Sequence, residues 1–239
     1  MPRGTVPSSS TEPIPVRVAS QRRLSPSARL LSLDWQPAFI PGQMIGLHTK
    51  RERPMRLYSI ASPPNYPTLD ILYTVVEGGE LTPTLDLLGS GDALWASEPR
   101  GEFIDRGRPA WWIANGTGIA PFLSMARSGI QKDRSLIHGA RTPEDMYFAA
   151  EMNAFDDLEY LPCLSRPESM AGGAENLAEL AYPGRLTRWL TEQIDRGKLS
   201  ADDRRWYYLC GSEQMILQVR QMLLSAGVGI DRVISEIYF

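Results

Sequence analysis

The chain has 239 residues, 22% of them charged and 43% hydrophobic, a balance that fits a folded protein with one large or two modest cores and excludes a disordered chain. Its two cysteines, Cys163 and Cys210, are too few for a four-thiolate iron–sulfur cluster or a disulfide framework, and neither His48 nor His138 stands in a metal-binding pattern, so we expect no metal site. Since no apolar run is long enough to cross a membrane and the first residues lack a secretory core, we expect a cytoplasmic protein.

The net charge of −3 is unevenly distributed along the chain. Residues 1–60 hold nine basic residues against three acidic ones, an excess of six positive charges. The basic residues are Arg3, Arg17, Arg22, Arg23, Arg29, Lys50, Arg51, Arg53 and Arg56. Such a face would attract an acidic protein partner and speed the encounter. The alternative is a solvated surface that includes some phosphate-binding arginines.

The first half of the chain alternates short β-type runs with turn residues. Six runs, broken by Pro and Gly, predict a small antiparallel barrel. They cover residues 16–19, 30–33, 44–48, 57–61, 69–76 and 93–96. One helix is expected over residues 83–88, between Gly79 and Gly89.

After Arg108 the pattern changes to strands and helices in alternation. Strands are expected at residues 110–114, 135–139, 158–164, 206–210 and 233–238. Helices are expected at residues 121–128, 143–155, 186–196 and 214–226. This order predicts a parallel sheet covered by helices.

The fold class expected from both halves is a two-domain β plus α/β protein. A disordered segment, residues 1–14, would precede a six-stranded antiparallel β-barrel over residues 15–104. A Rossmann-like domain with a parallel sheet would follow over residues 105–239.

A glycine loop joins the first strand of the second half to its helix. The sequence of residues 111–121 is Trp-Trp-Ile-Ala-Asn-Gly-Thr-Gly-Ile-Ala-Pro. Glycines at such a junction let backbone amides approach a pyrophosphate at the positive end of a helix, and Pro121 suits a first helical turn. The alternative is a simple tight turn. No Gly-x-x-x-x-Gly-Lys is present, which disfavours a P-loop phosphotransferase.

Arg56-Leu57-Tyr58-Ser59 lies on a predicted barrel strand. Strand alternation places Arg56 and Tyr58 on one face, so a cationic fork stands beside an aromatic ring. That pairing suits a ligand with phosphates and a flat ring system. A surface arginine beside a cross-strand tyrosine is the alternative.

Together these motifs resemble the ferredoxin–NADP reductase family, over nearly the whole chain. The resemblance implies that Arg56 holds the FAD pyrophosphate, Tyr58 stacks on the isoalloxazine and Ser59 approaches its N5. Residues 78–82, Gly-Gly-Glu-Leu-Thr, are similar to the glycine loop that closes on the pyrophosphate. Pro83 stands where bacterial members usually have a serine donor, so Thr82 or Thr84 would serve instead. The full FAD set implied is Arg56, Leu57, Tyr58, Ser59, Tyr73, Val75, Gly79, Leu81, Thr82, Thr84, Tyr238 and Phe239.

The nicotinamide side of the resemblance rests on the glycine loop, on Cys210-Gly211 and on three arginine-bearing segments, at residues 138–141, 165–166 and 184–187. The arginines would receive an adenosine 2′-phosphate, and one such contact is worth about 1.5–3 kcal/mol, so NADPH is expected over NADH. Residues 168–183 depart from the family in length and composition. The NADP set implied is Gly116, Thr117, Gly118, Pro121, Arg141, Ser165, Arg166, Arg185, Cys210 and Gly211.

The C-terminal Ser-Glu-Ile-Tyr-Phe resembles a family tail in which an aromatic ring covers the flavin. Glu236 would be the active-site acid and Tyr238 the stacking ring, although Phe239 leaves open which ring lies on the flavin. An apolar edge strand would explain Ile237 but not Glu236. The catalytic set implied is Ser59, Cys210, Glu236 and Tyr238.

The resemblance implies hydride transfer from NADPH to FAD N5, followed by single-electron steps to an acidic carrier, ferredoxin or flavodoxin. Neither nucleic acid nor membrane insertion is expected. Two alternatives stay open. One is the reductase component of an oxygenase, or an NAD(P)H:flavin reductase; the other is a non-catalytic flavoprotein that serves as a redox sensor.

Overall fold

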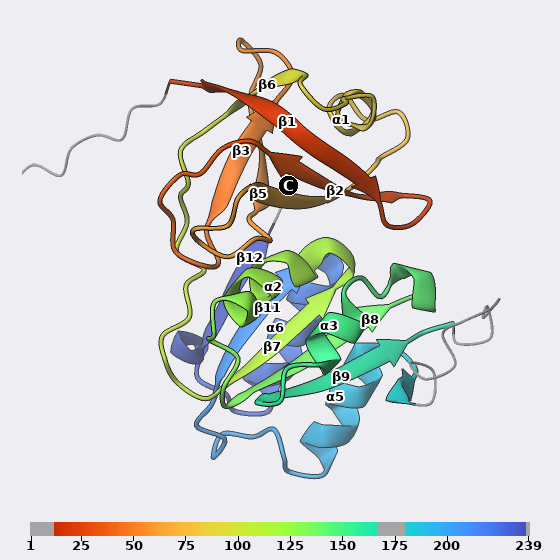
Figure 1. Ribbon diagram of the computed structural model, residues 1–239. Helices are drawn as coiled ribbons and strands as arrows, with labels where there is room; N and C mark the ends of the chain where they lie inside the picture. Colours follow the sequence, from red (N-terminus) through yellow and green to blue (C-terminus); the bar gives the residue numbers. More distant parts are fainter. Residues whose placement is uncertain (1–11, 167–179, 238–239) are drawn as a thin grey trace, which may run out of the picture.

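The computed structural model describes residues 12–166 and 180–237, which form an antiparallel barrel and a parallel sheet, one above the other (Figure 1). The barrel strands follow one another in the order β4-β3-β6-β1-β2-β5. An antiparallel bridge between Ile60 and Ile71 joins the two ends of this sheet and closes it. The strands are β1 (Ile14–Arg23), β2 (Ala28–Leu33), β3 (Met44–His48), β4 (Arg56–Ser59), β5 (Leu69–Thr74) and β6 (Ala93–Ala96).

Alternating side chains fill the barrel. On β1, Val16 and Val18 are buried while Arg17 between them is exposed, the period of two expected for a strand with one wet face. Leu31, Leu33, Ile45 and other apolar residues complete the same core. A short helix, α1 (Thr82–Asp86), lies between β5 and β6, with a proline in its first turn and Leu85 buried in the barrel core.

The second sheet is parallel throughout, in the order β10-β9-β8-β7-β11-β12. Its strands are β7 (Ala110–Asn115), β8 (Arg134–Ala140), β9 (Leu158–Leu164), β10 (Tyr182–Pro183), β11 (Trp206–Gly211) and β12 (Val233–Ile237). The helical segments are η1 (Gly116–Ile119), α2 (Ala120–Arg127), η2 (Pro143–Asp145), α3 (Ala149–Asn153), α5 (Leu186–Asp195), α6 (Glu213–Ser225) and η4 (Ile230–Arg232). None of the described helices has the length and apolarity needed to cross a membrane.

Strand β7 shows why this sheet needs two layers of helices. Trp112 and Ala114 belong to the core beneath α2, whereas Trp111 and Ile113 belong to the core beneath α5 and α6. A strand buried on both faces needs the continuous apolar run found here, and the alternation of strands and helices after Arg108 had predicted such a parallel sheet. The predicted fold is confirmed.

One predicted helix is wrong. Residues 143–155 form two pieces, η2 and α3, instead of a single helix. Phe148 between them has φ of 59°, a left-handed conformation that an α-helix does not allow. Met146 and Tyr147, which directly precede Phe148, are buried, so tertiary packing overrides the helical pattern. Strand β10 was not predicted, since it has only two residues and one is proline.

The predicted domain boundaries remain predictions, and two features of the structure bear on where they fall. Strand β1 begins at Ile14, inside the segment expected to be disordered, and residues 1–11 lie outside the described chain. The expected boundary at residues 104 and 105 falls in the connection between β6 and β7.

One of the hydrophobic cores extends across both domains. It joins Leu30 and Leu72 of the barrel to Phe122 of α2. A hydrogen bond of 2.7 Å from Ser124 Oγ to the Ser62 carbonyl crosses the same junction. Because this interface is packed and hydrogen-bonded, the carboxyl ends of the parallel strands are held against the barrel.

Candidate functional site

Three of the four predicted catalytic residues converge at the domain junction. Ser59 ends β4, and its Oγ donates to Glu236 Oε2 of β12 at 3.0 Å. Both side chains are buried, with exposed fractions of 5% and 6%. Cys210 is in register with Glu236 on the adjoining strand, so the three residues lie at one end of the sheet. Tyr238, the fourth, lies outside the described residues, as does Phe239.

The glycine loop packs directly on the Cys210-Gly211 backbone. A Cβ at Gly118 would lie 2.3 Å from the Cys210 carbonyl oxygen, so any other residue here would push the loop and β11 apart. Gly211 has φ of 143°, and a Cβ there would meet the Asn115 side chain at 2.0 Å. Asn115 Nδ2 donates to Ser212 Oγ at 2.9 Å, and Ser212 N donates to Asn115 Oδ1 at 2.8 Å. The two predicted motifs therefore form one unit.

Sequence reasoning missed Asn115 and Ser212 as members of this unit. Ser212 could have been found from the sequence, because serine is a preferred N-cap and stands just before a predicted helix. In the structure it caps α6 by accepting from Met215 N. Asn115 carried only its place before the first glycine, because its partner is 97 residues away.

A cleft of about 430 Å³ opens beside this unit, at the carboxyl ends of the parallel strands. Four predicted NADP residues from separate segments line it: Gly116, Arg141, Ser165 and Arg185. Thr117, Gly118, Pro121, Arg166, Cys210 and Gly211, also predicted, are not among its lining residues. Lining residues that were not predicted include Thr74, Asp145, Tyr147, Thr187, Gln214 and Gln218.

The cleft has the donor set for a phosphorylated ligand. Two exposed guanidinium groups, Arg141 and Arg185, stand with the hydroxyls of Ser165 and Thr187 around it. The Arg166 backbone N–H donates to the Arg141 carbonyl at 2.8 Å, which fixes the ends of the two strands relative to each other. Carboxyl ends of parallel strands are where α/β sheets bind nucleotides, and this lining fits NADP(H).

The barrel face of the junction fits a flavin. Arg56 is exposed, and next to it Tyr58 is half-buried with its ring edge-on to Tyr73 at a centroid distance of 6.4 Å. Burial raises the pKa of Tyr58 to about 12, so its ring is neutral. Leu57 is half-buried. Tyr73 is buried and donates through its hydroxyl to Gln21, so it supports Tyr58 from inside the barrel.

A threonine side chain closes the loop that precedes α1. Thr82 Oγ1 accepts from Val76 N at 2.8 Å, so its own hydrogen is left for a ligand, whereas Thr84 Oγ1 donates to the Leu81 carbonyl at 2.6 Å. Between the two threonines proposed as donors, the geometry favours Thr82. The other predicted loop residues differ in exposure: Val75 and Gly79 are half-buried and Leu81 is buried.

His138 supports the dinucleotide side without carrying charge. It is fully buried in β8, with Nδ1 3.1 Å from the Tyr160 hydroxyl. Burial lowers the pKa of His138 to about 4, against a smaller opposing effect of the Gly116 backbone. The ring is therefore neutral at physiological pH, beneath the loop that begins at Gly116.

The expected basic face is smaller than the sequence indicated. Arg29 is buried and paired with Asp86, and Arg53 forms an ion pair of 3.2 Å with Glu80. Arg3 lies outside the described residues. Exposed basic residues of the first 60 that carry no ion pair among the described residues are Arg17, Arg22, Arg23, Lys50, Arg51 and Arg56.

Comparison with known proteins decides the family. The family described as Oxidoreductase NAD-binding domain matches residues 112–221. Ferredoxin–NADP reductase B of Sorangium cellulosum (strain So ce56) is 31% identical, over 92% of this chain and 95% of its own length. The chain belongs to the ferredoxin–NADP reductase family. A second relative, the flavodoxin/ferredoxin–NADP reductase of Escherichia coli (strain K12), is 30% identical over 74% of this chain and 76% of its own length.

Solved structures show the same fold. A ferredoxin NADP+ reductase from Neisseria gonorrhoeae, with bound FAD and NADP, superposes with a TM-score of 0.81 at 19% identity, covering 96% of this chain and 100% of that one. The ferredoxin reductase in carbazole 1,9a-dioxygenase gives a TM-score of 0.79 at 23% identity, covering 98% of this chain and 71% of that one. The reductase fold thus also occurs in an oxygenase system.

Proposed function

We propose that this chain is a FAD-dependent oxidoreductase that exchanges electrons between NADP(H) and a one-electron carrier, ferredoxin or flavodoxin. The observation that carries the proposal is the buried hydrogen bond between Ser59 and Glu236. It joins the barrel to the last strand of the sheet, where the flavin-side and nicotinamide-side motifs meet. The family relationship supports the same function, since the two relatives described above are named for these carriers.

FAD, when bound, accepts a hydride and gives up electrons singly, and the protein supplies orientation and electrostatics. Arg56 would bind its phosphates, because the guanidinium is exposed at the start of β4. Tyr58 would present a neutral ring for stacking. Thr82 would donate its free hydroxyl hydrogen from the glycine loop.

Ser59 and Glu236 would hold a proton close to the reacting atoms. By donating to Glu236, Ser59 keeps its oxygen lone pairs available to accept a hydrogen bond. Since both side chains are buried, bulk water does not compete for this bond. Tyr238 or Phe239 is proposed as the ring that covers the flavin.

Arg141, Ser165, Arg166 and Arg185 are proposed to bind the adenosine 2′-phosphate and so to favour NADPH over NADH. One charge-assisted hydrogen bond of about 1.5–3 kcal/mol gives on the order of tenfold preference or more. Gly118 packs against the Cys210 backbone, and together the two residues would form the surface that nicotinamide contacts.

The carrier is proposed to be acidic and to dock on the exposed arginines of the barrel. A specific observation supports a second acceptor: the toluate 1,2-dioxygenase electron transfer component of Pseudomonas putida is 29% identical over 89% of this chain, although over only 62% of its own length. Reductase of an oxygenase is therefore the second candidate.

Anaerobic titration of the purified protein tests the proposal. We expect a yellow protein whose flavin absorbance is bleached by NADPH at lower concentration than by NADH. Oxidised ferredoxin, flavodoxin, an oxygenase component and free FMN are then added in separate reactions, and rapid reoxidation by ferredoxin or flavodoxin supports the first candidate. Colourless protein that takes up no FAD would refute the proposal, and FAD that NADPH does not bleach would indicate a non-catalytic flavoprotein.

A further inference from the structure

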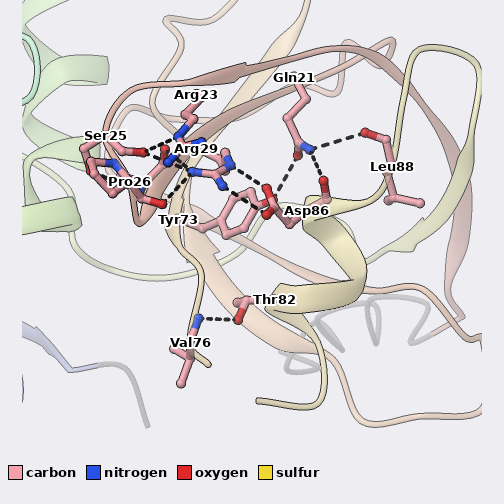
Figure 2. Close-up of polar contacts among 11 residues, drawn as sticks. Gln21, Arg23, Ser25, Pro26, Arg29, Tyr73, Val76, Thr82, Asp86 and Leu88 are labelled. Atoms are coloured by element: carbon pink, nitrogen blue, oxygen red, sulfur yellow. Dashed lines mark hydrogen bonds and ion pairs between the residues drawn. The ribbon is translucent and has the colours of Figure 1, made fainter. Parts of the chain in front are cut away.

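A largely buried ion pair of the barrel, with the Arg29 side chain 10% and the Asp86 side chain 29% exposed, serves none of the roles described above. Arg29 of β2 is 9% exposed, and its Nε and Nη2 both donate to the Asp86 carboxylate, the latter at 3.0 Å. Its Nη1 donates to three backbone carbonyls, of Ser25, Pro26 and Ala28, at 3.1–3.3 Å (Figure 2). Every nitrogen of this guanidinium has a protein acceptor, so Arg29 is engaged in contacts within the protein.

The pair fixes the far end of α1. Asp86 is the last residue of that helix, and the carbonyls of Asp86 and Leu88 also accept from Gln21 Nε2, at 3.2 and 3.3 Å. Gln21 is held in turn by the Tyr73 hydroxyl at 2.9 Å, and burial raises the pKa of Tyr73, so it remains a donor. Figure 2 shows these contacts gathered at one end of the helix, with Thr82 and Val76 at the other.

Little else fixes this helix. It has five residues, no side-chain hydrogen bond at its N-cap and one buried side chain, Leu85. A helix this short is not stable alone, so its position depends on tertiary contacts. The loop that would close on the FAD pyrophosphate, residues 78–82, runs directly into its first turn.

Stability alone does not explain a buried pair of this kind. Removing two charges from water costs about as much as their attraction returns, and apolar replacements of similar volume are often equally stable. What an apolar pair cannot reproduce is the direction of a bidentate contact together with the carbonyl contacts. The pair therefore specifies where α1 lies.

We propose that Arg29 and Asp86 are positioning residues for FAD: they hold α1 so that the loop at residues 78–82 meets the pyrophosphate. The inference rests on the proposed function, because it requires FAD. Its consequence is selective. Loss of the pair weakens contacts to the phosphates and leaves contacts to the flavin ring intact.

The test compares FAD with riboflavin, which has the same ring system and no phosphate. In the full-length chain freed of flavin, the dissociation constants of both are measured by fluorescence quenching, together with the melting temperature. For Arg29→Met/Asp86→Leu we expect the FAD constant to rise about tenfold, as for the loss of one charge-assisted hydrogen bond. The riboflavin constant should change less than about twofold, within the non-additivity between separate sites.

A second buried pair provides the control. Arg134 and Asp105 also make a bidentate contact, at 2.5 and 3.2 Å, with side chains 8% and 2% exposed, but they lie at the opposite end of the parallel sheet from the site. This pair is more deeply buried than Arg29 and Asp86, so its loss is at least as large a change to the protein interior. Arg134→Met/Asp105→Leu should nevertheless bind FAD like the wild type.

If the first double variant fails to fold, Asp86→Asn is tested instead, because it preserves the side-chain shape and replaces a charged hydrogen bond with a weaker neutral one. This variant should raise the FAD dissociation constant about threefold. Unchanged FAD affinity in the folded variant, or equal weakening of FAD and riboflavin, would overturn the inference while the proposed function stands. Wild-type protein that binds no FAD would overturn both.

Discussion

Gly118 offers the sharpest test of the contact between the glycine loop and the Cys210-Gly211 backbone. Alanine at this position would place its methyl carbon 2.3 Å from the Cys210 carbonyl oxygen, 2.5 Å from the carbonyl carbon and 2.6 Å from Gly211 Cα. These are backbone atoms of β11, which is hydrogen-bonded between β7 and β12, so they cannot turn aside as a flexible side chain would. Restoring an ordinary contact of about 3.5 Å requires a displacement of about 1 Å.

The magnitude follows from that displacement. Overpacking of this kind costs about 2 kcal/mol, which for 239 residues lowers the melting temperature by about 4 °C. A shift of about 1 Å in a group that positions substrate can slow the reaction about 100-fold. We therefore expect Gly118→Ala to be folded, modestly less stable and severely slowed in NADPH-driven bleaching of the flavin, measured by anaerobic stopped flow.

Gly129→Ala is the matched control. Gly129 follows α2, has φ of 79° and has no atom within 4 Å of an added Cβ. It should lose about 1 kcal/mol through its left-handed backbone and keep the wild-type rate. If Gly118→Ala bleaches its flavin as fast as Gly129→Ala does, the loop does not position nicotinamide through this contact.

Three further predictions concern the junction and the cleft. Glu236→Gln should retain FAD and slow electron exchange about 100-fold, because an amide cannot take up the proton that Ser59 donates toward Glu236; an unchanged rate in rapid mixing removes Glu236 from the mechanism. Arg141→Ala should raise KM for NADPH about tenfold and leave KM for NADH unchanged, as steady-state kinetics would show; an equal rise for both would place no 2′-phosphate there. His138 stays neutral when folded, since its pKa is about 4 against an ordinary 6.5, so protons bind the unfolded chain first as the pH falls below 6.5. Urea unfolding should show the wild type losing about 2 kcal/mol between pH 7 and pH 5 relative to His138→Phe, and parallel losses would contradict the burial argument.

The fold was largely predictable from the sequence because local pattern and burial agree in most elements. The run from Ala110 to Ala114 is apolar at every position, and both of its faces are covered in the structure. The prediction failed where a contact between residues far apart in the sequence determines the backbone conformation. Tyr147 leaves the helical path and its hydroxyl lies 3.1 Å from Ser25 Oγ, a residue 122 positions earlier. No local pattern contains that partner.

The candidate site divides in the same way. Arg141, Ser165 and Arg185 line one cleft, and each stands in a segment that the family resemblance had pointed to. Asn115 was missed, since it acts on the protein itself and pairs with Ser212 across 97 residues. Arg29 was counted as a surface charge, although Asp86, 57 residues later, draws it into the barrel. Residues that support a site leave weaker local signals than residues that touch the ligand.

A series of hydrogen bonds links α1 of the barrel to the cleft in the second domain. Ser25 offers its carbonyl to Arg29, which holds α1, and its hydroxyl to Tyr147, which lines the cleft. The Tyr147 hydroxyl also donates to Asp145 of the cleft at 3.2 Å. A displacement of α1 would therefore reach the cleft through hydrogen bonds alone. Hydride transfer tolerates little error in distance, and these hydrogen bonds, together with the core shared by the two domains, would keep the two proposed cofactor sites in register.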